Sequence, residues 1–436
     1  MSFPRYEAYK ESGIEWLGKV PAHWRCLPIS AVATCNDEVL TEATPADFEI
    51  QYVEISDVEH GGGICASTTM LFADAPSRAR RKVANGDVIV STVRTYLKAI
   101  AQVKRPPSNL VVSTGFAVIR PQAIQSGYLG LLIASEYVIA EVISRSVGVS
   151  YPAINASEVM SIKIPMPPSK EQSVIAAFLD RETAKIDALV EEQRRLIALL
   201  EEKRQAVISH AVTKGLDPAA PMKHSGVEWL GEVPAHWRIV KLKHLFCLIK
   251  LQECANLPIL SVYRDYGVIE KASRDDNINK TPEDLSLYQT VRQGDLVINK
   301  MKAWQGSLGI SALNGITSPD YAVFSEKHSE NCQFLNYLLR CRRLPSLFRS
   351  LSNGIRPDQW RIEPDKFLQL SVALPDTNEQ RAIVERLDRE TAKSSTLIAE
   401  SQSAITLLQE RRAALISAAV TGKIDVRGLA QAAEAA

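Results

Sequence analysis

The chain contains an internal repeat that limits how it can fold. Residues 12–25, SGIEWLGKVPAHWR, return 213 positions later at 225–238 as SGVEWLGEVPAHWR, with two substitutions. A second repeat, FLDRETAK at 178–185 and RLDRETAK at 386–393, has an offset of 208. Each half of the chain therefore carries a variable block followed by a repeated one, as a tandem duplication would.

Length and composition indicate an ordinary globular chain. With 436 residues, of which 46% are hydrophobic, the chain is long enough for two to four domains with their own cores. No apolar run reaches the roughly 18 residues of a membrane span, and the start MSFPRYEAYK lacks the apolar stretch of a secretory signal. Seven cysteines without a CxxC pair favour reduced, structural thiols over disulfides or a zinc site. We predict a cytoplasmic protein.

Basic residues are clustered although the net charge is only +1. Residues 76–105 contain eight lysines and arginines against one acid, Asp87, and residues 340–361 contain six arginines against Asp358. Clustered basic charge is typical of phosphate binding, and a solvated surface is the alternative. Charge alone leaves the choice between these open.

The repeated blocks have the periodicity of long helices. Apolar positions recur at alternating intervals of four and three residues, which is the seam of a coiled coil. Two such stripes would most simply bury themselves against each other. The predicted seams are Ile175, Leu179, Glu182, Ile186, Leu189, Gln193, Leu196, Leu200, Lys203 and Val207, and Ile383, Leu387, Glu390, Ser394, Leu397, Ser401, Ala404, Leu408, Arg411 and Leu415.

Local signals set the limits of these helices. Prolines at 165, 167 and 168 precede the first helix, Ser169 with Gln172 resembles a capping box, and Gly215 is placed to end it. The second helix is predicted to begin after Pro375 and to end near Gly422. A helix of about forty residues is roughly 60 Å long.

The variable blocks look strand-rich and alike in framework. Asn85-Gly86-Asp87 leads into the apolar run 88–90, and Gln293-Gly294-Asp295 leads into 296–298 at the same offset of 208. Each is typical of a turn followed by a strand, and strands are also expected at 115–118 and 320–323. Similar frameworks with divergent surfaces indicate two related domains that recognise different things.

No pattern in the chain predicts an active site. The GxxxxGK[ST], GxGxxG, HExxH and GxSxG motifs are absent, and His23 and His236, in the repeated VPAHW element, are better explained by packing or capping than by catalysis. Residues 318–321, SPDY, differ by one residue from an amino-methyltransferase signature, but a turn entering a strand explains them. Residues 61–63, GGG, are expected to be a flexible loop rather than a phosphate cradle. We predict no catalytic residue and no metal ligand.

These elements, in this order and present twice, resemble the specificity subunit of type I restriction-modification systems over nearly the whole chain. The motifs that carry the resemblance are W-L-G-x-V-P-x-H-W at 16–24 and 229–237, the G-D-hydrophobic strands, and P-P-x-x-x-Q at 167–172. In the second half only Pro375 and Gln380 of the last motif are present. The helix ends 202–208 and 410–416 complete the pattern.

The resemblance implies an α+β fold with two mixed α/β target-recognition domains, separated by an antiparallel pair of long coiled-coil helices. The expected boundaries are 1–165 and 217–373 for the domains, 166–216 and 374–426 for the helices, and 427–436 for a tail. It also implies partners: double-stranded DNA, two methyltransferase subunits and two ATP-dependent restriction and translocase subunits, with no membrane. S-adenosylmethionine, ATP and Mg²⁺ would be bound by the partners, and no cofactor by this chain.

In such a subunit each domain would read one half of a split DNA target, and the helices would set the gap. The candidate contacts are basic and aromatic residues near the framework turns, and Arg94 and Lys302 are equivalent under the offset of 208. The rivals are a self-contained methyltransferase or nuclease, and a coiled-coil scaffold without a DNA role. The candidates are Arg78, Arg80, Arg81, Arg94, Tyr96 and Lys98 in the first domain, and Lys300, Lys302, Trp304, Arg342, Arg343 and Arg356 in the second.

Overall fold

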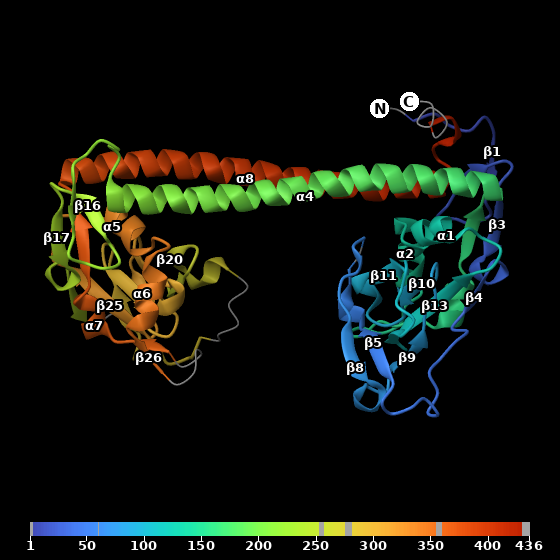
Figure 1. Cartoon of the computed structure of the whole chain (residues 1–436), viewed down its shortest axis with the longest axis horizontal. Helices are drawn as coiled ribbons and strands as arrows, with labels where there is room; N and C mark the ends of the chain where they lie inside the picture. The colour runs from blue at the N-terminus through green and yellow to red at the C-terminus, as the bar shows by residue number, and fades with distance from the viewer. Residues whose placement is uncertain (1–2, 60, 253–256, 275–280, 355–359, 430–436) are drawn as a thin grey trace. The chain divides into compact units, whose positions relative to one another are not determined.

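The computed structural model describes residues 3–59, 61–252, 257–274, 281–354 and 360–429. The chain divides into two compact units, unit 1 with residues 1–193 and 403–436, and unit 2 with residues 194–402. The longest helices, α4 (Ser169–Lys214) and α8 (Thr377–Val420), each contribute one half to each unit (Figure 1). The predicted domain boundaries follow sequence blocks rather than these packing units, and they stay a prediction.

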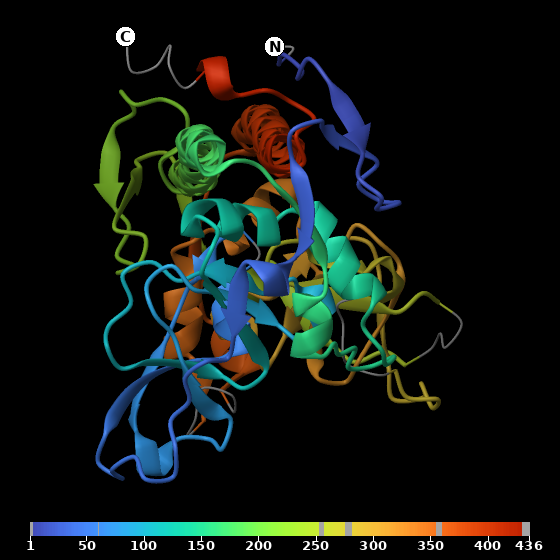
Figure 2. The same ribbon diagram turned by 90° about the vertical axis from the view of Figure 1, so that its right-hand side faces the viewer.

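Two β-sheets form the body of unit 1 (Figures 1 and 2). The first is antiparallel with the order β11–β10–β13–β4, and the second has the order β8–β5–β12–β9, in which β12 runs parallel to β5. The strands are β4 (Ala33–Cys35), β10 (Val88–Ser91), β11 (Ile100–Gln102) and β13 (Phe116–Pro121), and β5 (Glu49–Val53), β8 (Thr68–Leu71), β9 (Ala79–Lys82) and β12 (Leu110–Ser113).

The apolar run after the Gly-Asp turn is buried on both of its faces. Val88 and Val90 pack into the core that contains helices α1 (Ser126–Ile133) and α2 (Glu136–Ser144). Ile89 points the other way, into the core formed with Val112 of the second sheet. Since successive strand residues face opposite sides, a strand between two layers must be apolar throughout.

Unit 2 repeats the first sheet with the equivalent strand order β18–β25–β22–β23. Leu296 and Ile298 of β22 face the core that contains helix α5 (Cys332–Leu339), and Val297 faces a second core with Val323. The predicted strands at 88–90, 115–118, 296–298 and 320–323 are thus confirmed, each starting within one residue of its prediction, and β13 and β25 extend three residues further. The strands are β18 (Phe246–Ile249), β22 (Leu296–Asn299), β23 (Leu308–Ile310) and β25 (Tyr321–Glu326).

Shorter elements complete both units. Each unit opens with a hairpin and a strand that pairs with the strand before the long helix. In unit 1 these and the remaining elements are β1 (Tyr9–Glu11), β2 (Lys19–Pro21), β3 (Arg25–Pro28), β6 (Val58–Glu59), β7 (Gly63–Ile64), α3 (Ala156–Met160) and β14 (Lys163–Met166). In unit 2 they are β15 (Met222–His224), β16 (Glu232–Pro234), β17 (Arg238–Lys241), β19 (Leu260–Tyr263), β20 (Gly267–Glu270), β21 (Gln289–Val291), β24 (Gly315–Thr317), α6 (Leu344–Ser350), β26 (Ser352–Asn353), β27 (Arg361–Ile362), α7 (Pro364–Leu368) and β28 (Ser371–Leu374).

The repeated VPAHW element holds the start of a long helix in each unit. In unit 1 the Glu171 carboxylate accepts hydrogen bonds from Tyr6 Oη at 2.6 Å and Trp24 Nε1 at 3.1 Å, and lies 2.8 Å from His23 Nε2. In unit 2 Glu379 lies 2.8 Å from His236 Nε2 and accepts from Trp237 Nε1 at 3.2 Å. Both histidines are therefore placed at helix starts, where a carboxylate also complements the helix dipole.

The predicted capping box at Ser169 is wrong. Ser169 is the first helical residue rather than the residue before the helix, and the Gln172 side chain makes different bonds. Its amide nitrogen donates to Pro167 O at 2.9 Å, and its Oε1 accepts from the backbone nitrogen of Gln125 at 2.9 Å. The residue before the helix is a proline, which has no N–H group that could donate a hydrogen bond to a capping side chain. Gln172 instead links the start of α4 to α1.

The predicted seams of α4 and α8 are half right. Ile175, Leu179 and Ile186 are buried as predicted, but Leu189 and Leu196 are exposed, and Val190 and Ile197 take their places. On α8, Leu397 is exposed and Ile398 is turned inward. A helix with 3.6 residues per turn drifts from a strict 3.5-residue repeat. The buried stripe therefore advances by four residues at points where the predicted seam advances by three.

Two further sequence patterns have plain structural roles. Residues 318–321 form a turn closed by Tyr321 N donating to Ser318 O at 3.0 Å, and β25 begins at Tyr321, as predicted. The glycines at 61–63 lie at the tip and return of the β6–β7 hairpin, where Arg412 Nη2 of α8 donates to Gly61 O at 3.5 Å. The loop is thus held by α8 within unit 1.

The duplicated Gly-Asp turns differ in how the aspartate is neutralised. Asp87 receives two hydrogen bonds from Arg120, at 2.9 and 3.0 Å, and one from Ala84 N at 2.7 Å. Asp295 accepts from Arg292 N at 2.7 Å, and the strand register places Ser325 at the position equivalent to Arg120. Burial raises the pKa of Asp295 above its usual value of 3.8. Its charge therefore opposes folding of unit 2.

We expect Asp295→Asn and Asp87→Asn to have opposite effects. A carboxyl group whose pKa is higher in the folded than in the unfolded state makes the fold less stable as the pH rises through that pKa. Asp295→Asn should therefore stabilise unit 2 at pH 7 and change little at pH 3. Asp87→Asn should destabilise unit 1 by about 2–3 kcal/mol at pH 7, because Arg120 loses its buried carboxylate partner and keeps only the exposed one, Glu38. Hydrogen exchange of β10 and β22, compared with the unsubstituted chain at each pH, measures both. Destabilisation by both variants at pH 7 would contradict the difference.

Candidate nucleic-acid interface

Each unit places a basic and an aromatic residue on one tight turn directly after its central strand. In unit 1 the turn is the 3₁₀ segment Thr95–Leu97, preceded by Arg94, and in unit 2 it is Ala303–Gln305, preceded by Lys302. Tyr96 and Trp304 occupy equivalent positions within these turns. Tyr96 is exposed and Trp304 is half-buried.

The turn of unit 1 is held in an unfavourable backbone conformation. Arg94 and Lys98, which flank the 3₁₀ segment, have φ values of 51°. The equivalent of Lys98 is Gly306, with φ of 90°. Left-handed backbone costs a side-chain-bearing residue about 1 kcal/mol, so two such residues in one turn mark a shape imposed by the surroundings.

A second loop is fastened to this turn in both units by the same hydrogen bond. Ile154 N donates to Thr92 O at 2.9 Å in unit 1, and Ile362 N donates to Lys300 O at 3.0 Å in unit 2. In unit 1, Thr95 Oγ1 also donates to Ser146 Oγ at 2.8 Å. The two loops of each unit therefore form one surface.

Aromatic rings and cations are stacked on these surfaces. The Arg94 guanidinium lies 4.9 Å from the centre of the Tyr151 ring. In unit 2 the Trp304 and Trp360 rings meet edge to face with centres 5.3 Å apart, and Arg349 lies 4.6 Å from the Trp360 ring. Such stacking fixes the direction of a guanidinium while leaving its N–H groups free to bind.

The other candidates of unit 1 differ in their accessibility. Arg78 donates to Glu54 at 2.6 Å and to Tyr52 Oη at 3.1 Å, and these bonds raise its pKa. Its carbonyl accepts from Thr114 N, so Arg78 lies close to the turn through residues 114–115. Lys98 Nζ lies 3.5 Å from the Glu136 carboxylate.

Arg80 and Arg81 occupy adjacent positions of β9, and their side chains have different surroundings. The Arg80 guanidinium lies 4.6 Å from the Phe72 ring centre. The Arg81 side chain is half-buried near Cys35, its Nη1 has no hydrogen-bond partner within the described parts of the chain, and burial lowers its pKa. Arg81 is thus the candidate of unit 1 that the fold presents least to a ligand.

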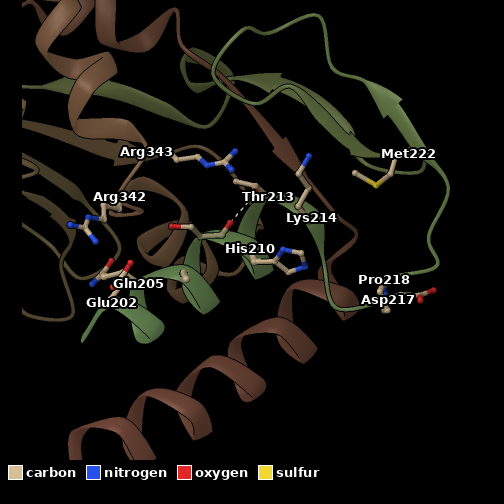
Figure 3. A pocket seen from close by; sticks show the side chains of 12 residues that line it. Glu202, Gln205, His210, Thr213, Lys214, Asp217, Pro218, Met222, Arg342 and Arg343 are labelled. Atoms are coloured by element: carbon tan, nitrogen blue, oxygen red, sulfur yellow. Dashed lines mark hydrogen bonds between the residues drawn. The ribbon is translucent and has the colours of Figure 1, made fainter. Parts of the chain in front are cut away.

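In unit 2 the structure separates the candidates into two groups. Lys300, whose pKa burial lowers, donates from Nζ to Pro319 O at 2.7 Å and lies beside Lys302 and Trp304. Arg342 and Arg343 lie elsewhere, in an open groove of about 660 Å³ along the last turns of α4 (Figure 3). Arg356 falls outside the described residues.

Sequence reasoning missed several residues of these surfaces. Val147, Val149 and Tyr151 are exposed on the second loop of unit 1, and Arg349 and Trp360 lie on the surface of unit 2. A search for clustered basic charge cannot find exposed valines. The usable signal was the offset of 208 between Asn155 and Glu363, which precede equivalent short helices and mark the returning loop in both halves.

Neither a metal centre nor a membrane-spanning helix is evident in the described part of the chain. No three His, Cys, Asp or Glu residues there are grouped to hold a metal ion. No single described helix is long and apolar enough to cross a membrane. The bent pair α1 and α2 passes such a test jointly, and Leu129, Leu132 and Val138 of that pair are buried in the core of unit 1.

Comparisons with known proteins show which class of protein this chain resembles. Residues 73–198 match the family model of the type I restriction modification DNA specificity domain. The chain is 25% identical over 308 residues to the type I restriction enzyme MjaVIII specificity subunit of Methanocaldococcus jannaschii, covering 66% of this chain and 68% of that one. It is 21% identical over 445 residues to the EcoKI specificity subunit of Escherichia coli K12, covering 95% and 92%.

Solved structures agree with this class. A chain from a structure of the type I R-M system is 25% identical, with a TM-score of 0.64, and the match covers 92% of this chain and 98% of that one. The HsdS subunit of Thermoanaerobacter tengcongensis shares the fold at 23% identity and a TM-score of 0.51, over 95% and 100% of the two chains. The predicted α+β fold and the resemblance to type I specificity subunits are confirmed.

Proposed function

We propose that this chain is the DNA sequence-recognition subunit of a type I restriction-modification complex. The observation that supports this most directly is the repeated turn, with Arg94 and Tyr96 in unit 1 and Lys302 and Trp304 in unit 2. Two domains whose surfaces have otherwise diverged keep a cation and an aromatic ring at the same place on the same framework. This is the arrangement expected of two readers that recognise different sequences.

The contacts would divide between bases and phosphates. An arginine such as Arg94 can donate two hydrogen bonds to guanine in the major groove, and Lys302 can donate to the same acceptors. Arg78 and Lys98, already paired with carboxylates, suit the positioning of the DNA backbone. Arg342 and Arg343, beside α4, would reach phosphates rather than the bases near Lys302. The remaining candidates are Arg80, Arg81, Tyr96, Lys300, Trp304 and Arg356.

The target would be bipartite, with one half-site for each domain and a fixed gap set by α4 and α8. Adding one base pair to the gap moves the second half-site by about 3.4 Å and turns it by about a tenth of a turn. Two readers carried by continuous helices could not follow this change. A duplex whose gap is one base pair too long should therefore bind like unrelated DNA.

Catalysis would belong to partners in the cytoplasm. Two methyltransferase subunits would bring S-adenosylmethionine, and two restriction and translocase subunits would use ATP and Mg²⁺. Exposed leucines on the long helices support protein docking there, since exposed large apolar side chains in groups mark interaction sites. They are Leu189 and Leu407 in unit 1 and Leu196, Leu199 and Leu397 in unit 2.

Arg94→Ala should weaken binding at one half-site by about 10-fold or more, the effect of losing a bidentate base contact. Lys302→Ala should act on the other half-site only. The target is first obtained by mapping methylated adenines in the host genome. Anisotropy then measures binding of duplexes with substitutions in either half-site to the chain co-purified with its methyltransferase subunit.

A charge-matched control is Lys19→Ala, on β2 and exposed to solvent, which should change neither half-site. A loss that is equal for every duplex would move Arg94 to phosphate positioning. Two other results would favour the rival functions. Methyl transfer by the purified chain alone would indicate an enzyme, and a complex that binds no duplex would indicate a scaffold.

A further inference from the structure

The DNA-facing surface proposed for unit 1 ends in a cluster of exposed apolar side chains. On the second loop the exposed fractions are 80% for Val147, 101% for Val149 and 65% for Tyr151. Val93 and Leu97, on the turn, are also exposed. Large apolar side chains grouped at the end of two joined loops gain nothing from folding, so they indicate a surface that is covered by a ligand.

This cluster, Val93, Leu97, Val147, Val149 and Tyr151, is held in place by the backbone. Val147 N donates to Ala153 O at 2.9 Å, and Ala153 N returns a bond to Val147 O at 3.0 Å, which closes the loop that carries Val149. Ala153 also forms a β-bridge with Val93 of the turn. The valines are thus presented on a closed loop tied to the strained turn, and they need not be ordered by the ligand.

Charge and family position identify the ligand class. Arg94 stacks on Tyr151 inside the cluster, which places a cation beside the valines. All five residues of the cluster lie within the segment 73–198 that matches the DNA specificity domain. An apolar cluster beside a fixed cation suits the major groove, where the thymine methyl is the apolar group among the base edges.

We propose that Val147 and Val149 read thymine methyl groups in the half-site bound by unit 1. The inference rests on the proposed function. A valine offers no hydrogen bond, so it can distinguish base pairs only by contact with a methyl group or by filling a gap between bases. The β-branched side chains reach outward from a closed loop, which favours contact with base edges. Insertion between bases, as minor-groove proteins do with apolar wedges, is the alternative outcome.

The test replaces thymine by deoxyuridine, which removes the methyl group and keeps every hydrogen-bonding atom. The duplex carries the mapped target, and the probe is the chain co-purified with its methyltransferase subunit. Each contacted methyl should be worth about three- to five-fold in affinity, the effect of burying one methylene-sized group. Replacing thymine by deoxyuridine in the half-site of unit 2 should cause no loss of affinity that depends on Val147 or Val149.

Val149→Ala completes the test, since a fully exposed side chain is not needed for folding. The variant should lose most of its preference for thymine over deoxyuridine, while Val39→Ala, an exposed valine outside both loops, should keep it. Three results would overturn the inference: a unit 1 half-site without A·T pairs, equal binding of thymine and deoxyuridine, or a preference that survives in Val149→Ala and Val147→Ala. A complex without any sequence preference would instead refute the proposed function.

Discussion

Glu171→Ala is expected to destabilise unit 1 by about 3–5 kcal/mol, the range for a buried charged group whose removal leaves its partners unpaired. The Glu171 side chain is 7% exposed and joins Tyr6, His23 and Trp24. Burial and the hydrogen bond to Glu171 raise the pKa of Tyr6 far above its usual value of 10, so Tyr6 remains a donor. The substitution would leave the hydrogen-bond donors of Tyr6 and Trp24 without an acceptor inside the core.

Glu379→Ala is the matched control for this prediction. Glu379 occupies the equivalent place in unit 2, but its side chain is 26% exposed and it bonds to His236 and Trp237 without a tyrosine. Position 219, which corresponds to Tyr6, is an alanine. We expect a loss of about 1–2 kcal/mol, because water can replace part of what is removed.

Urea unfolding followed by hydrogen exchange in each unit measures both losses separately. Glu171→Gln should recover part of the stability, since its amide oxygen still accepts a hydrogen bond. Equal losses for Glu171→Ala and Glu379→Ala would show that burial and the tyrosine contribute nothing, and would refute the comparison.

The framework could be predicted because the duplication gives each local signal twice. The turns at Gly86 and Gly294 precede apolar runs that no exposed strand would carry, and both runs are central strands. Gly215 and Gly422 end the long helices, as predicted from glycine's freedom to adopt positive φ. These signals are local, and a local signal does not need the rest of the fold.

The helix seam and the cap could not be predicted because they depend on partners distant in the sequence. The choice between Leu189 and Val190 is set by which face of α4 meets α8, and both residues are apolar. The bonds of Gln172 are set by Gln125, 47 residues earlier. Periodicity determines that a stripe exists, and packing decides its phase.

The candidate site divides in the same way. Arg94, Tyr96, Lys302 and Trp304 follow framework strands directly, so the offset of 208 places them correctly on equivalent turns. The basic clusters in the sequence predicted Arg81, Arg342 and Arg343. Strand alternation turns Arg81 away from those turns, and the start of α6 places Arg342 and Arg343 in the groove beside α4. Residues that are close in sequence are predicted to share a surface only when they lie on the same turn.

The repeated VPAHW element changed so little because it contacts two helix ends at once. Within unit 1 its Trp24 bonds to the start of α4, and Pro21 and Trp24 pack against Gly422 at the end of α8. Within unit 2 the equivalent Trp237 bonds to Glu379 of α8 and packs against Gly215 of α4. One side chain serving two helices has few acceptable replacements.

This double contact makes Gly422→Ala the second large expected effect, a loss of about 2–4 kcal/mol in unit 1. A Cβ atom at Gly422 would lie 2.4 Å from Pro21 Cδ and 2.6 Å from Pro21 Cγ, and its φ is +72°. The left-handed backbone costs about 1 kcal/mol, and forcing an atom into a packed contact costs about 1–3 kcal/mol more. The proline ring cannot rotate away, so the helix end must move.

Two glycines of the same chain separate these contributions. Gly13 has the same φ of +72° with nothing within 4 Å of a Cβ, so Gly13→Ala should show the backbone cost alone, about 1 kcal/mol. Gly215, with φ of +78° and Glu379 Oε1 at 3.2 Å, should fall between them. Hydrogen exchange in the unit that carries each substitution gives all three values. If Gly422→Ala were no worse than Gly13→Ala, the contact with Pro21 would not hold α8, and VPAHW would serve one helix rather than two.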